Sequence, residues 1–70
     1  MAQDHTYKIT ELVGSSQDSI DDAVRKGVAR AAKSVHNMKW FEVTEIRGHI
    51  EGDRVGHWQV SMKIGFTVDD

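Results

Sequence analysis

Hydrophobic and polar residues alternate most regularly between Trp40 and Phe66, in two runs separated by Gly52-Asp53. A two-residue loop that contains glycine closes a tight β-hairpin, because glycine adopts positive φ without steric strain. We therefore expect Glu51 to face Arg54 across this loop. The opposed pairs in that register are Phe41 and Ile64, Glu42 and Lys63, Val43 and Met62, Thr44 and Ser61, and Ile46 and Gln59.

The predicted register sorts the hairpin onto two faces, since side chains alternate from one side of a strand to the other. One face is apolar and needs a cover; it carries Phe41, Val43, Trp58, Val60, Met62, Ile64 and Phe66. The other is mostly polar but has a large indole at one end; it carries Trp40, Glu42, Thr44, Ile46, Gln59, Ser61 and Lys63. Glu45 and Arg47 interrupt the apolar alternation, which predicts either a bulge at Gly48 or a strand that projects beyond its cover.

The first half of the chain predicts one strand and one helix. Residues 7–13 alternate imperfectly with period two, and Gly14-Ser15-Ser16 is expected to end this strand and to cap the helix with Ser15 or Ser16. Helical periodicity covers residues 17–36, with an apolar stripe of Ile20, Ala23, Val24, Gly27, Val28, Ala31 and Val35. Glycine on the stripe indicates close approach to the sheet, and the small stripe residues are expected to leave room for Trp58 and Phe66.

These elements predict an α+β fold in the order β-α-β-β. Its three-stranded sheet is largely antiparallel, and one amphipathic helix covers one face. The sequence leaves open which long strand the first strand joins. The opposite face of the sheet has no cover within the chain, so we expect something else to cover its indole.

Length and composition limit the classes of function. Seventy residues predict one domain over residues 1–70, small enough to need oligomerisation because cysteine, and with it disulfides and thiolate metal sites, is absent. The net charge of −2 argues against nucleic acid as a partner. Without a signal peptide pattern or an apolar run of the roughly 20 residues that span a bilayer, a cytoplasmic protein that does not contact membranes is expected.

Trp40 is the strongest candidate for a binding residue, because an indole is broad, rigid and able to stack on a flat aromatic ligand. Gln59 lies on the same predicted face, and its amide can both donate to and accept from a heterocycle edge. The alternatives are a subunit interface for Trp40 and a solvated strand position for Gln59. Arg47 could meet a carboxylate across an interface or a ligand phosphate, and Glu42 is expected to pair with Lys63.

Catalytic and metal sites are not predicted. The chain lacks a cysteine, a nucleophile elbow and a glycine-rich phosphate loop, so no catalytic residue is nominated and an enzyme is not expected. The four histidines, His5, His36, His49 and His57, show no metal-ligand spacing. His49 and His57 fall on opposite faces in the predicted register, so no metal site is expected.

Two segments carry a resemblance that extends over nearly the whole chain. Trp-Phe-Glu-Val-Thr-Glu-Ile-Arg-Gly begins at Trp40, and His-Trp-Gln-Val-Ser-Met-Lys-Ile-Gly-Phe ends at Phe66. Together with the first strand, which ends Leu-Val-Gly-Ser-Ser, and the amphipathic helix, they resemble the bacterial branch of the dodecin family of small flavin-binding proteins. Two positions depart from the family pattern. Trp58 stands where tyrosine is frequent, and Thr67 stands where some relatives carry an arginine associated with coenzyme A, which argues against a coenzyme A site.

The resemblance implies a hollow homododecamer with flavins bound between subunits at two-fold axes. Each flavin ring would stack on the residue matched by Trp40 and hydrogen-bond to the residue matched by Gln59, with two flavins between symmetry-related tryptophans. It implies FMN as the ligand, with riboflavin or lumichrome as other occupants, and Arg47 as a contact of the phosphate. The implied role is flavin storage or buffering and photoprotection rather than turnover. A structural homo-oligomer without a ligand, in which Trp40 only fills an interface, is the alternative.

Overall fold

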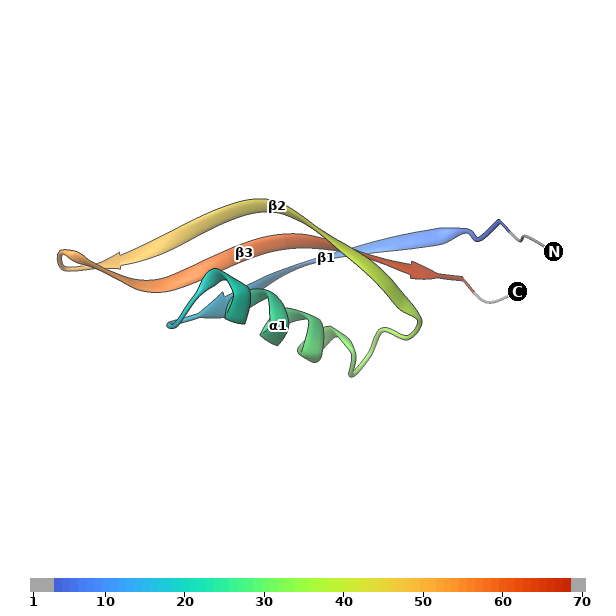
Figure 1. Ribbon diagram of the computed structural model, residues 1–70, viewed down its shortest axis with the longest axis horizontal. Helices are drawn as coiled ribbons and strands as arrows, with labels where there is room; N and C mark the ends of the chain where they lie inside the picture. The colour runs from blue at the N-terminus through green and yellow to red at the C-terminus, as the bar shows by residue number, and fades with distance from the viewer. Residues whose placement is uncertain (1–3, 69–70) are drawn as a thin grey trace.

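The computed structural model describes residues 4–68 and is elongated, with extents of 56 × 21 × 16 Å (Figure 1). The elements in chain order are β1 (Tyr7–Ser16), α1 (Ile20–Ala31), β2 (Met38–Glu51) and β3 (Arg54–Thr67). This order confirms the predicted α+β class and the β-α-β-β succession. The helix found among these residues is neither long nor apolar enough to cross a bilayer.

The sheet has the strand order β1-β3-β2, and both neighbouring pairs are antiparallel. The structure thus settles the question that the sequence left open, because β1 joins β3 rather than β2. The helix lies beside the sheet and is shorter than the β2-β3 hairpin, which extends beyond it at the end opposite the chain termini (Figure 1). Because β3 is the central strand, its side chains contribute to both faces of the sheet.

The hairpin loop is as predicted: Glu51 pairs with Arg54, and Gly52 has a φ of 65°. The pairings of Phe41, Glu42 and Val43 are also confirmed. Beyond Val43 the predicted register is wrong, because Thr44 is an extra residue in β2. The corrected pairs are Glu45 with Ser61, Ile46 with Val60, and Arg47 with Gln59.

A second irregularity restores the original register near the loop. His49 pairs with His57 and Ile50 pairs with Val55, so Gly56 is the extra residue, this time on β3. The prediction was either a bulge at Gly48 or a strand that projects beyond the helix. The hairpin does extend beyond the helix (Figure 1), and the register shifts lie at Lys39, Thr44 and Gly56 rather than at Gly48. An added residue turns the following side chains to the other side of the strand. Ile46 therefore lies on the helix side, and Glu45 and Arg47 lie on the opposite side, the reverse of the simple alternation.

The first strand continues through Gly14 to Ser16, three residues beyond its predicted end. Consequently the helix begins later than predicted, at Ile20, and ends earlier, at Ala31. Its N-cap is Ser19, whose hydroxyl accepts the Asp22 amide at 3.0 Å. The predicted caps Ser15 and Ser16 are both strand residues instead.

Ser16 organises the turn before the helix rather than the first helical turn. Its Oγ accepts the backbone amides of Asp18 at 2.9 Å and Ser19 at 3.3 Å, and it donates to Asp22 Oδ2 at 2.6 Å. This hydroxyl, together with the Lys26 ammonium 2.9 Å from the same oxygen, lowers the pKa of the Asp22 carboxyl below its usual value. The β1-α1 connection is thus held by side-chain hydrogen bonds at both ends.

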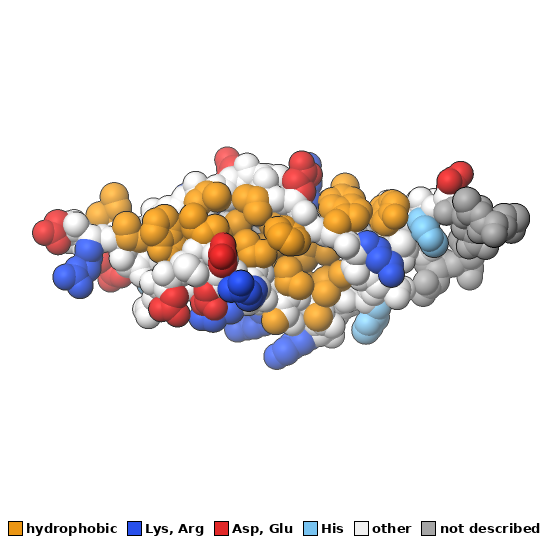
Figure 2. Space-filling view, viewed as in Figure 1, with side chains coloured by type: hydrophobic (Ala, Val, Ile, Leu, Met, Phe, Trp, Pro, Cys, Tyr) orange, Lys and Arg blue, Asp and Glu red, His pale blue; other side chains and the backbone are white. Residues whose placement is uncertain are grey.

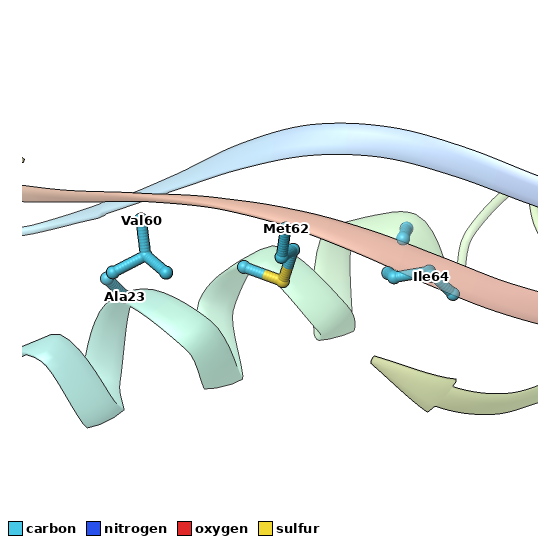
Figure 3. Packing of buried hydrophobic residues seen from close by; sticks show 5 residues of the cluster. Ala23, Val60, Met62 and Ile64 are labelled. Atoms are coloured by element: carbon cyan, nitrogen blue, oxygen red, sulfur yellow. The ribbon is translucent and has the colours of Figure 1, made fainter. Parts of the chain in front are cut away.

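The core lies between β3 and α1. Val60, Met62 and Ile64 point from β3 toward the helix and are 0–1% exposed, and Ala23 of the helix is fully buried beside them (Figure 3). The approach is close, because a Cβ added to Gly27 would lie 3.0 Å from Leu12 Cδ1 and from Met62 Cε. This confirms the reason given for that glycine. The room is taken by β1 and Met62, however, and not by Trp58 and Phe66, which lie outside the core cluster.

The helix packs on β1 and β3 and leaves the helix side of β2 open. Phe41 and Val43 were expected on the covered apolar face, but they are 51% and 38% exposed, and Ile46, which the Thr44 bulge turns to this side, is 52% exposed. In the space-filling view, hydrophobic side chains form a long band across the molecule between charged groups (Figure 2). An apolar surface of this length is typical of a chain that associates with others.

Candidate functional site

The face of the sheet opposite the helix, which we name the open face, follows from the strand pairing. In antiparallel sheets opposed residues point to the same side. The open face consists of Tyr7, Ile9, Glu11, Val13 and Ser15 from β1, His57, Gln59, Ser61, Lys63, Gly65 and Thr67 from β3, and Trp40, Glu42, Glu45, Arg47 and His49 from β2. Tyr7, Ile9 and Val13 are 45–54% exposed, so the chain itself supplies no cover there.

Trp40 lies on this face, as predicted, opposite Gly65. Its indole lies directly over the Gly65 backbone, because a Cβ added to Gly65 would overlap the ring atoms Cε2 and Cζ2. Gly65 is consequently buried although no helix covers it. The tryptophan nevertheless remains 39% exposed. One side of the ring is occupied by protein, and the other is turned outward.

Tyr7 of β1 stands at the edge of the indole. The two ring centroids are 6.2 Å apart, and the ring planes make an angle of 54°. Tyr7 in turn contacts His5, whose ring centroid lies 6.4 Å away in an edge-to-face arrangement. The result is a shallow aromatic corner with Gly65 as its base, Tyr7 at one side and the free indole face open to a neighbour.

Arg47 and Gln59 form a polar group on the open face, separate from the aromatic corner. The Thr44 bulge places these two residues opposite each other. The guanidinium Nη2 of Arg47 donates to Glu45 Oε1 at 2.7 Å and to Ser61 Oγ at 3.0 Å. An arginine carries five N–H donors, so others are left for an incoming anion. The structure therefore brings Arg47 and Gln59 together and places Trp40 on the same face.

Trp40 and Gln59 of one chain are nevertheless far apart. Gly65, under the indole, and Gln59 are six positions apart on β3, about 20 Å at roughly 3.3 Å per residue. A flat three-ring ligand cannot contact both side chains of one chain at that separation.

The remaining charged and histidine pairs differ from expectation. Glu42 and Lys63 are opposed as predicted, but they are not among the salt bridges of residues 4–68. His49 and His57 were placed on opposite faces, which is wrong, because the Gly56 bulge makes them a directly opposed pair with ring centroids 6.2 Å apart. Within the described part of the chain, no group of three or more His, Asp or Glu side chains is arranged to hold a metal ion.

Sequence reasoning missed two members of the aromatic corner. Tyr7 was assigned only as a strand residue, and Gly65 was quoted without a role. A glycine inside an otherwise apolar strand often marks a close approach of another group, which was the available signal for Gly65. Tyr7 could not be assigned, because its position beside Trp40 depends on the pairing of β1 with β3.

Three comparisons with known proteins agree. The family model described as Dodecin matches residues 6–69. The dodecin of Thermus thermophilus is 41% identical over 64 residues, which cover 91% of this chain and 93% of that protein. Among solved structures, the dodecin from Streptomyces davaonensis has a TM-score of 0.92 at 46% identity, covering 97% of this chain and all of that one. The dodecin from Streptomyces coelicolor has a TM-score of 0.92 at 48% identity, covering 99% of both chains.

Proposed function

The chain belongs to the dodecin family, and from this premise we propose that it stores or buffers a flavin by holding the ring between copies of itself. The observation that carries the proposal is the indole of Trp40, which has one side backed by the Gly65 backbone and the other turned outward. A rigid, backed aromatic surface is what a flat heterocycle stacks on. A stacked indole also suits photoprotection, because it lies in contact with the excited ring.

The proposed site needs at least two chains. Trp40 of one copy provides the stacking surface, and Gln59 of a second copy provides donor and acceptor groups for the ring edge. The support is the separation of about 20 Å between the two positions within a chain, six residues at roughly 3.3 Å each. The exposed apolar side chains of β1 and β2 support association as well, because a neighbouring copy would bury them. We propose the homododecamer of the family as the assembly.

FMN is the proposed ligand, with riboflavin and lumichrome as other occupants that share its ring system. The support is Arg47, which lies opposite Gln59 and has donors left beyond those given to Glu45 and Ser61. Arginine binds phosphate through two parallel hydrogen bonds, so it would favour the phosphorylated ligand. A coenzyme A site is not proposed, because Thr67 offers no positive charge.

We propose a binding role in the cytoplasm rather than an enzymatic one. The open face combines an aromatic surface, an amide and an arginine that is already paired with Glu45. Such groups can hold and orient a ring, which is what a binding role requires. The alternative is a ligand-free structural oligomer, and the exposure of Tyr7 and Ile9 around the indole gives that alternative its support.

The test is a titration of the ligand-free protein with FMN, followed by flavin fluorescence. Binding should quench the flavin emission. Trp40→Ala should weaken binding by about 1–3 kcal/mol, the range found when an aromatic stacking partner is removed. Trp58→Phe is the matched control, because Trp58 lies on the helix side of β3, and it should leave the affinity unchanged. An assembled protein that takes up no flavin would favour the structural alternative.

A further inference from the structure

Gly65 is the most closely covered position of the open face. It is buried, yet the atoms over it belong to the Trp40 indole and not to the helix. Glycine is unfavourable inside a strand, because it leaves the backbone flexible and offers no side chain to pack. A reason specific to this position is therefore needed.

The backbone conformation does not supply that reason. Within residues 4–68, Gly52 is the glycine with positive φ, so an alanine at position 65 could adopt the same backbone. The reason is the lack of room beneath the Trp40 ring, because a methyl group at Gly65 would occupy the volume of Cε2 and Cζ2 of the indole. Only the absence of a side chain lets the ring lie directly against the backbone of β3.

We propose that Gly65 is a positioning residue of the ligand site. Its bare backbone sets the height and tilt of the Trp40 ring, and Tyr7 limits the ring at one side, 6.2 Å away at 54°. The indole is thereby held in its stacking orientation before a ligand arrives, which reduces the ordering cost of binding. The effect on affinity rests on the proposed flavin function, whereas the effect on the ring does not.

The first experiment compares Gly65→Ala with Gly48→Ala, both in a Trp58→Phe background so that Trp40 is the remaining tryptophan. Gly48 is the matched control, because a Cβ there would meet only ordinary contacts, 3.4 Å from the His57 carbonyl oxygen and 3.7 Å from Val55 Cγ1. Without ligand, Gly65→Ala should change the near-ultraviolet circular dichroism and the emission of Trp40. Its FMN affinity should fall roughly tenfold or more, as overpacked sites lose complementarity. Gly48→Ala should stay within about twofold of the background, since its methyl group is accommodated.

The second experiment removes the indole. If the clash with Trp40 is the defect, Gly65→Ala should lower the unfolding midpoint of the parent protein but have little effect in a Trp40→Ala background. If Gly65→Ala alone does not fold, its effect in the Trp40→Ala background still tests whether the clash with the indole is the cause. Equal damage in both backgrounds would overturn the proposal, as would Trp40 spectra and FMN affinity that do not change. If the parent protein binds no FMN, the proposed function fails, and the ligand-free spectra and the double variant still test the role of Gly65.

Discussion

The two faces of this sheet are built from the same three strands but differ in what covers them. On the helix side, Val60, Met62 and Ile64 are 0–1% exposed beneath α1. On the open face, the large and mostly apolar side chains of Tyr7, Ile9 and Trp40 are 39–54% exposed. The helix covers the first face over β1 and β3, and this buried part holds the fold together. The second is left incomplete, and in our account a flavin and another copy of the chain complete it.

Adjacent residues of one strand also serve the two different faces. Met62 and Ser61 are neighbours in β3, yet Met62 packs on the helix and Ser61 accepts a hydrogen bond from Arg47 at 3.0 Å. The pleat of a strand sends adjacent side chains to opposite sides. Substitutions one residue apart should therefore separate stability from ligand binding.

The largest expected effect is on the covered face. Met62→Ala should lower the free energy of unfolding by about 2–5 kcal/mol, because it leaves a cavity against α1. Denaturant unfolding at a fixed protein concentration measures this. Ile50→Ala is the control, since Ile50 is 72% exposed at the hairpin end, and it should cost no more than about 0.5 kcal/mol. Similar losses for both variants would mean that burial beneath α1 does not determine the stability.

A smaller and more selective effect is expected at Arg47. Arg47→Ala should weaken FMN binding by about 1.5 kcal/mol, the lower end for a hydrogen bond to a charged group, because the side chain is partly exposed. Riboflavin and lumichrome carry no phosphate, so their affinities should hardly change. Arg54→Ala, at the hairpin loop, is the control. An equal loss for all three ligands would show that Arg47 acts on the assembly and not on the phosphate.

Several features of the fold could be predicted from the sequence because local chemistry determines them. The Gly52-Asp53 loop determines the register of the two adjacent pairs, Glu51 with Arg54 and Ile50 with Val55, and the spacing of small residues marks the helix face that approaches the sheet. The helix N-cap was predicted wrongly because Ser15, Ser16 and Ser19 offer the same hydroxyl. The choice among them depends on the length of β1 and on Asp22, whose carboxylate engages Ser16.

The candidate site was only half predictable for a different reason. Trp40 and Gln59 stand out by residue type, and the pattern placed both on one face. The bulge at Thr44, whose hydroxyl donates to the Ser61 carbonyl oxygen at 3.2 Å, has no local sequence signal, and it decides that Arg47 lies opposite Gln59. Tyr7 and Gly65 act on Trp40 from two other strands, so their contribution depends on tertiary contacts.

The central claim is that one ligand ring contacts Trp40 of one chain and Gln59 of another, and subunit mixing tests it most directly. Trp40→Ala and Gln59→Ala chains should each bind FMN weakly on their own. Co-expressed in one assembly, they should regain a fraction of sites with the affinity of the unmodified protein, because an intact tryptophan can meet an intact glutamine from the other variant. Titration of the mixed assembly that shows only the weak binding of the separate variants would contradict this account.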